Sequence, residues 1–183
     1  ADKVIIDNLT PKFTGGLNLG VSWKNLSLFG QFSFTYGGKI YNLDEQLLRS
    51  TELGYDDVMK NKPDYILDRW TQENQSSRYP RFVVGAHGAQ NETGWNDRPS
   101  TLYLFDASFL KLNKLTLSYN LPQNWIQKLG MTSCSVYLSG ENLFTLKNKK
   151  LNVPDPEAAL TSGIAQKGVP SPRSFMIGLD LTF

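Results

Sequence analysis

The chain has 183 residues, of which 40% are apolar, 20% charged and 12% aromatic, and its formal net charge is +2. A charge this small, without a run of Lys or Arg, gives no support to nucleic-acid binding. The single Cys and single His exclude an internal disulfide and a histidine-clustered metal site. No stretch approaches about 18 consecutive apolar residues, so the sequence predicts no transmembrane helix, although membrane strands that alternate apolar and polar residues escape this test.

Two long alternating segments come first, near residues 12–23 and 26–37. In the first segment, Leu17, Leu19 and Val21 are separated by small or polar residues, which is the period of a strand with one apolar face. The short connection between the two segments predicts an antiparallel hairpin. Each segment is long enough for a tilted membrane strand of about 9–11 residues, whereas strands of globular proteins average about 5–6.

Residues 39–100 lose this alternation. The spacing of Leu43, Leu47 and Leu48 predicts a short helix, and residues 55–70 have room for another helical turn or two. A connection of about 60 residues is far longer than an ordinary loop, and its aromatic residues argue against disorder. Its flat rings and polar side chains suit the capture of glycans or peptides, and they equally suit contacts with a protein or packing of the loop onto its own scaffold. The candidate contact residues are Trp70, Asn74, Tyr79, Arg81, Trp95, Asp97 and Arg98.

Strands return in the second half of the chain, near residues 102–120, 134–145 and 174–183. In the first of these strands the apolar phase slips at Asn113 and Lys114, which predicts a β-bulge or a change of environment along one strand. Residues 121–133 predict a short connector with a helical turn closed by Gly130. The next, longer connection contains Asp155-Pro156-Glu157, a turn signature in which Pro fixes φ.

Side chains of the kinds used in catalysis are scattered along the chain. A pair of carboxylates can hydrolyse a glycoside, and a His can act as a base. Here the acidic pairs fall in a helical segment or in Pro-rich loops, where capping and surface charge explain them, and His87 has no acidic neighbour in the sequence. Glycine-rich phosphate loops and the His-Glu-x-x-His motif are absent. The sequence therefore predicts neither an enzyme nor a bound cofactor or metal.

Five stretches, in series over nearly all of the chain, carry a family resemblance. They read TPKFTGGLNLGVSWKNLSL, then RWTQEN with YPR, then DASFLKLNKLTLSYNLP, then VYLSGENLFTL with DPE, and finally the terminal strand ending in LTF. Together they resemble the C-terminal part of the SusC/RagA-like TonB-dependent transporters of Bacteroidetes outer membranes.

This resemblance implies an all-β chain that forms the last five or so strands of an antiparallel transmembrane β-barrel with roughly 22 strands. Short turns would face the periplasm, and residues 39–100 would form a long extracellular loop containing short helical turns. Residues 1–183 lack the plug and N-terminal domains of that family. The other strands and the plug would therefore come from the remaining N-terminal part of the same transporter, because open sheet edges are not viable in lipid. The chain would be a multi-pass part of the cell outer membrane.

In such a barrel the apolar faces of the strands contact outer-membrane lipid, and aromatic residues near the short turns form a girdle at the interface. The terminal strand would also carry the signal that the outer-membrane insertion machinery reads, through Gly178, Leu181 and Phe183, although Met176 departs from the polar residue that is commoner at its position. The residues expected to face lipid are Leu17, Leu19, Val21, Phe32, Phe34, Leu179 and Leu181, and those expected in the girdle are Trp23, Tyr119 and Phe183.

The resemblance further implies that the intact protein imports nutrient oligomers, with glycans expected and peptides as the alternative. It would work with a SusD-like surface lipoprotein and draw energy from the TonB complex through the plug, with no nucleic acid as partner. The strand pattern alone leaves open a second hypothesis of a different class, a soluble β-rich glycan-binding module.

Overall fold

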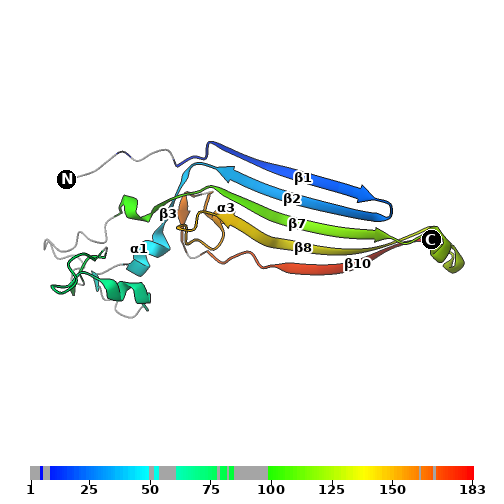
Figure 1. Ribbon diagram of the computed structural model, residues 1–183. Helices are drawn as coiled ribbons and strands as arrows, with labels where there is room; N and C mark the ends of the chain where they lie inside the picture. Colours follow the sequence, from blue (N-terminus) through cyan, green and yellow to red (C-terminus); the bar gives the residue numbers. More distant parts are fainter. Residues whose placement is uncertain are drawn as a thin grey trace.

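The structure of the chain is a computed structural model. Its largest element is an antiparallel sheet of five long strands that occur in the same order in space as in the sequence (Figure 1). These strands are β1 (Phe13–Trp23), β2 (Leu26–Tyr36), β7 (Phe109–Asn120), β8 (Ser133–Lys147) and β10 (Ser174–Thr182). Within the described residues, β1 and β10 each pair on one side only. The residues that the structure describes are 5, 9–49, 52–53, 61–77, 79–81, 83–84, 99–160, 162–166 and 168–183.

The register of the strands brings their apolar residues onto one face of the sheet. One row crosses all five strands, because each residue in it lies directly opposite the next. The side chains of this row are between 40% and 80% exposed. Its members are Val21, Leu28, Leu117, Leu138 and Ile177. The seven residues expected to face lipid all lie on this apolar face, which follows from the same register.

The opposite face of the sheet is polar. A matching row again crosses all five strands, and within it the Lys114 ammonium lies 3.9 Å from the Glu141 carboxylate, which in turn accepts a hydrogen bond from the Ser174 hydroxyl (3.3 Å). The members of this row are Asn18, Gln31, Lys114, Glu141 and Ser174. The sheet therefore separates an apolar surface from a polar one over its whole width.

The phase slip predicted in the third long strand is confirmed as a bulge. The register of β7 shifts against both neighbours between Leu112 and Lys114: Asn113 is an extra residue relative to β2, whereas two residues of β8, Asn142 and Leu143, lie opposite it on the other side. Because of the bulge, the apolar residues before and after it stay on the same face. Asn113 accepts a hydrogen bond from the Ser33 hydroxyl (3.3 Å), and across the sheet Asn142 of β8 has a φ of +53°.

The strand predicted over residues 102–120 is divided in two. A 3₁₀ turn (Thr101–Tyr103) and a short strand, β6 (Leu104–Asp106), precede β7, and β6 belongs to a separate sheet. The break falls at Ala107, which is fully buried, and the Asp106 carboxylate accepts a hydrogen bond from the Ser108 N–H (2.8 Å). This local bond turns the chain and competes with continued pairing.

A small second layer of structure lies at the end of the long sheet where β2 ends and β7 begins (Figure 1). Its sheet has the order β6-β3-β9, with β3 (Lys39–Asn42) at the centre and β9 (Ile164–Ala165) parallel to it. Helix α1 (Leu43–Arg49) confirms the predicted short helix, and α3 (Pro156–Leu160) corrects the predicted turn at Asp155-Pro156-Glu157. Pro156 is the first residue of α3, a position where its missing N–H costs nothing. The core of this layer consists of Ile40, Ala107, Leu151, Val153, Ala159 and Ala165.

Five shorter elements complete the description. A pair of parallel strands, β4 (Glu52–Leu53) and β5 (Val83–Val84), and a 3₁₀ helix, η1 (Asp64–Asp68), lie in the long connection between β3 and β6. At the opposite end, α2 (Gln123–Ile126) and η3 (Gln127–Leu129) join β7 to β8, and Gly130 ends them with a φ of +71° as predicted. Among the described residues, no helix has both the length and the apolar character to cross a membrane.

Candidate functional site

The structure describes four of the seven candidate contact residues, and it brings three of them together. The backbone N–H of Trp70 donates to the backbone carbonyl oxygen of Tyr79 (2.8 Å). The Asn74 side-chain amide donates to the Asp68 carboxylate (2.7 Å) within the same short segment. Arg81 is exposed two residues beyond Tyr79. The other three candidates, Trp95, Asp97 and Arg98, lie outside the described residues, as does His87.

Tyr79 packs the long loop onto α1. Its ring stacks on the Tyr65 ring at a centroid distance of 5.3 Å, and the Arg49 guanidinium lies 5.5 Å from the Tyr65 ring and 5.6 Å from the Tyr79 ring. The Arg49 Nε also donates to the Glu45 carboxylate (2.5 Å), which accepts a second hydrogen bond from the Tyr65 hydroxyl (3.1 Å). The Arg49 cation contacts both stacked rings on one side and the buried Glu45 carboxylate on the other. These contacts fix the positions of all four side chains.

The titration of these groups reflects their burial. Burial lowers the pKa of Arg49, but its hydrogen bond with Tyr65 and its interactions with Glu45 outweigh that effect and raise the pKa above its ordinary value. Burial also raises the pKa of the Tyr65 hydroxyl. Both groups therefore keep one protonation state throughout the neutral range. Tyr79 thus has a packing role, whereas Trp70 and the neighbouring Leu67 are exposed on this loop.

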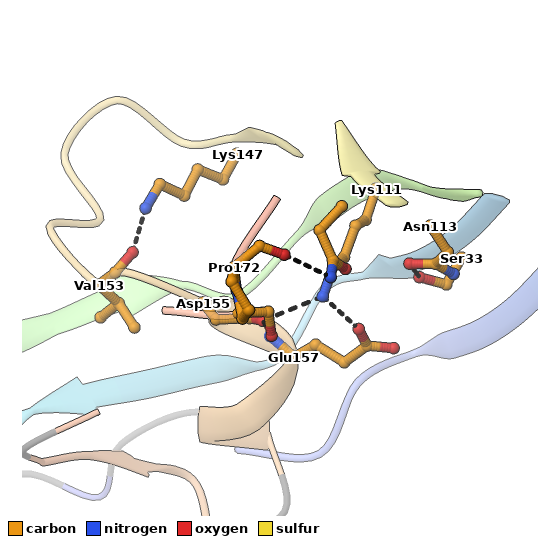
Figure 2. Close-up of polar contacts among 10 residues, drawn as sticks. Ser33, Lys111, Asn113, Lys147, Val153, Asp155, Glu157 and Pro172 are labelled. Carbon is orange, nitrogen blue, oxygen red and sulfur yellow. Dashed lines mark hydrogen bonds and ion pairs between the residues drawn. The ribbon is translucent and has the colours of Figure 1, made fainter. Parts of the chain in front are cut away.

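A second polar cluster ties the connection between β8 and β10 to the polar face of the sheet (Figure 2). Lys111 of β7 is buried, and its ammonium donates to the Asp155 carboxylate (3.0 Å) and to the Glu157 carboxylate (2.9 Å). Two more contacts support this attachment: the Lys147 ammonium donates to the Val153 carbonyl oxygen, and the Asn142 amide donates to the Pro172 carbonyl oxygen (3.0 Å). The connection therefore folds over the sheet.

Asp155 is the centre of this second cluster. Besides Lys111, it accepts hydrogen bonds from the Ser171 hydroxyl (2.9 Å) and the Glu157 N–H (3.0 Å). Burial raises the pKa of the Asp155 carboxyl, but these hydrogen bonds and the charge of Lys111 outweigh it and hold the pKa below its ordinary value. The sequence predicted only surface charge or capping for Asp155 and Glu157. Their partner lies 44 and 46 residues away, and no local pattern indicates such a pairing.

A pocket of about 180 Å³ lies beside this cluster, between α3, β9 and residues 152–155. Its lining combines amide and carboxylate groups with small apolar side chains, including Asn42, Asn152, Val153, Asp155, Ile164 and Gln166. Ligand sites usually have volumes of about 300–1,000 Å³. The pocket is therefore smaller than most ligand sites. The described residues contain no group of three or more His, Cys, Asp or Glu side chains that could hold a metal ion.

The terminal strand β10 carries the three residues expected to form the assembly signal. Gly178 lies opposite Tyr137 of β8, and a Cβ atom at Gly178 would lie 2.2 Å from the Tyr137 ring, so any other residue there would require the ring to move. Leu181 lies opposite Cys134 on the apolar face, and Phe183 is exposed. The three positions therefore differ in their surroundings: one is covered by an aromatic ring and two are apolar and open.

Curated relatives match the whole chain. The chain is 29% identical over 191 residues to the TonB-dependent receptor P26 of Formosa agariphila and 28% identical over 193 residues to the TonB-dependent receptor P3 of the same organism. It spans 18% and 17% of the length of these two relatives. No family model matches the sequence.

Solved structures match the fold as well. The chain superposes on the RagAB peptide transporter with a TM-score of 0.80 and 31% identity, and on the RagAB peptide importer in its closed-closed state with a TM-score of 0.79 and 30% identity. In both cases the match covers 97% of this chain and 18% of the solved chain. These relatives are a receptor and importers rather than enzymes, in agreement with the sequence, and the five-stranded sheet corresponds to part of a larger β-barrel.

Proposed function

We propose, on the premise that the chain is in sequence and in fold a segment of a SusC/RagA-like TonB-dependent transporter, that the whole protein imports nutrient oligomers across the outer membrane. The observation that carries the proposal is the sheet itself. An apolar row and a polar row each cross all five strands, so the sheet has the two surfaces that a wall between lipid and a wet lumen requires. Residues 39–100 would then lie outside the cell, and the remaining strands and the plug would come from the N-terminal part of the same protein.

Glycans are the cargo expected from the family resemblance, and peptides are the second candidate. The peptide candidate is favoured by the solved structures, which are described as those of a peptide importer and transporter. Trp70 and Leu67, exposed on the long loop, are suited to contact either cargo, because an aromatic face packs on a sugar ring and on an apolar peptide side chain alike. Trp95, Asp97 and Arg98 remain candidates in the same loop.

Two partners belong to this proposal. A SusD-like surface lipoprotein would close the extracellular side of the barrel, and the TonB complex would supply energy through the plug. The exposed Trp70 and Leu67 suit a contact with the lipoprotein as well as they suit cargo, because protein interfaces are also rich in aromatic residues.

Fractionation and growth test the proposal in the organism that makes the full-length protein. We expect the protein in the outer-membrane fraction, with faster migration in an unheated gel sample than in a heated one, as for a folded barrel. We expect a deletion strain to lose growth on one class of oligomer, either oligosaccharides or oligopeptides, while it still grows on the corresponding monomers. A water-soluble monomer would instead support the glycan-binding module, and growth unchanged on both classes would refute import of nutrient oligomers.

A further inference from the structure

The short connection between β7 and β8 is a well-defined helical turn. It comprises residues 123–129, which we call the anchoring turn, and Gly130 closes it in the left-handed conformation. The Met131 N–H donates back to the Ile126 carbonyl oxygen (3.2 Å), and α2 packs against β8. The turn is therefore held in a fixed position at the end of the sheet.

The anchoring turn presents an apolar surface outward. Ile126 is 2% exposed, whereas Trp125 is 64% exposed and Leu129 is 68% exposed. Trp125 and Leu129 are four residues apart, a spacing that places them on one side of a helix. Ile126 is the residue of this turn that is buried within the chain. Packing within the chain therefore does not explain why Trp125 and Leu129 are apolar.

The end of the sheet next to the anchoring turn also exposes aromatic and apolar side chains. The row that ends the apolar face runs from Trp23 to Tyr119, both exposed, and the Lys24 ammonium lies 4.9 Å above the Trp23 ring. Cys134, on the apolar face at the start of β8, is 8% exposed, although its partner across the pair, Leu181, is 50% exposed. Cys134 therefore lies in a covered part of the apolar face, next to the connector, where the Leu121 N–H donates to its carbonyl oxygen (2.9 Å).

We propose that the anchoring turn inserts Trp125 and Leu129 into the headgroup region of the phospholipid leaflet next to the short turns. A Trp ring at this depth keeps its N–H in water and its apolar body in the acyl boundary. Leu129 adds apolar contact, and the exposed Lys128 beside it is able to pair with a lipid phosphate. The proposal rests on the proposed function, because it requires that the apolar face of the sheet lies in a membrane.

Spin labels on the full-length transporter in phospholipid vesicles test this proposal. Single labels replace Trp125, Leu129 or Gln127 in a protein whose native cysteines, including Cys134, are changed to Ser. Gln127 is the matched control, because it lies two residues from each of the others and therefore on the opposite side of a helix. We expect the labels at Trp125 and Leu129 to be reached by oxygen more than by a water-soluble nickel complex, at a depth of about 5–10 Å into the headgroup boundary. The label at Gln127 should show the reverse.

Two outcomes overturn the proposal. Equal access of the nickel complex to all three labels would place the turn in water, and labels at Trp125 and Leu129 shielded from both reagents would place it against protein. A fourth label, at Leu19 on the apolar face, separates this result from the proposed function. If the Leu19 label is in lipid while the labels on the anchoring turn are in water or against protein, only the present proposal fails. If the Leu19 label is itself in water, the barrel assignment fails.

Discussion

Lys111 and Lys114 lie on the polar face of the same strand, yet their ion pairs differ in burial. Lys111 bonds Asp155 at 3.0 Å with both side chains at or below 10% exposure, whereas Lys114 and Glu141 are 3.9 Å apart and about 40% exposed. Removing one partner of a buried pair costs about 3–5 kcal/mol, while an exposed pair contributes about 0–1 kcal/mol. We therefore expect Lys111→Met to release the connection between β8 and β10, and Lys114→Met to leave it in place.

Hydrogen exchange of the full-length protein measures this difference directly. A loss of about 3 kcal/mol corresponds to a local opening equilibrium that rises about 100-fold. The exchange rates of peptides from residues 148–173 should rise about 100-fold in Lys111→Met and should be unchanged in Lys114→Met. Similar exchange in both variants would mean that Lys147, Asn142 and the apolar core hold the connection without Lys111.

Asp155 makes the same attachment sensitive to acid. Its pKa is lower in the folded protein than its ordinary value of 3.8, so the carboxylate stabilises the fold above pH 3.8 and this contribution disappears as pH falls through the folded pKa. Exchange in residues 148–173, corrected for its intrinsic pH dependence, should be constant from neutral pH to about pH 5 and should rise below about pH 4. In Asp155→Asn the rise should be absent, because the titrating group is gone. A rise of equal size in this variant would assign the acid response to another carboxylate.

At the scale of elements, alternation and spacing predicted the long strands, the first hairpin, α1, the turn closed by Gly130 and the bulge at Asn113. Each of these depends on residues close in sequence. The division of residues 102–120 was not predicted, because Ala107 is buried by segments far along the chain. The helix at Pro156 and the partners of Lys111 were missed for the same reason. The ring of Tyr79 packs on Tyr65, a contact that no spacing in the sequence indicates, and a contact of Tyr79 with cargo or with the lipoprotein stays a prediction.

The contact between β8 and β10 gives Gly178 a specific requirement. A methyl group there would collide with the Tyr137 ring, whereas at Gly20 of β1 the nearest atom, in the Phe29 ring, would be 4.0 Å away. We expect Gly178→Ala to lower the amount of folded, surface-exposed full-length protein and Gly20→Ala to leave it unchanged. The double variant Gly178→Ala with Tyr137→Ala should recover part of the loss, because it removes the ring. No recovery would mean that Gly178 matters for a reason other than the fit with Tyr137.

Over the whole molecule, the two outer strands are the vulnerable parts. In the described part of the chain, β1 and β10 each have one unpaired edge, and the apolar face between them is exposed. Such edges pair readily with other chains until a neighbour covers them. Within the closed barrel proposed above, both edges would find partners among the strands supplied by the rest of the protein. Assembly is therefore the step at which this part of the protein is most exposed to aggregation.

Phe183 stands at the end of β10, where that risk is greatest. Its side chain is exposed, so it contributes little packing within this chain, and even a buried aromatic side chain would be worth only about 3–5 kcal/mol. If the aromatic end is instead the residue that the insertion machinery binds, deletion of Phe183 from the full-length protein should strongly reduce the amount of folded protein at the cell surface. Those molecules that do assemble should bind cargo as the unaltered protein does.

The measurement compares the amounts of surface-exposed, heat-modifiable protein with and without Phe183 at equal synthesis. The Phe183→Tyr variant is the control, because it keeps an aromatic ring. Equal amounts in all three would show that Phe183 is an ordinary strand residue, and reduced binding per assembled molecule would show that its role lies in the finished barrel.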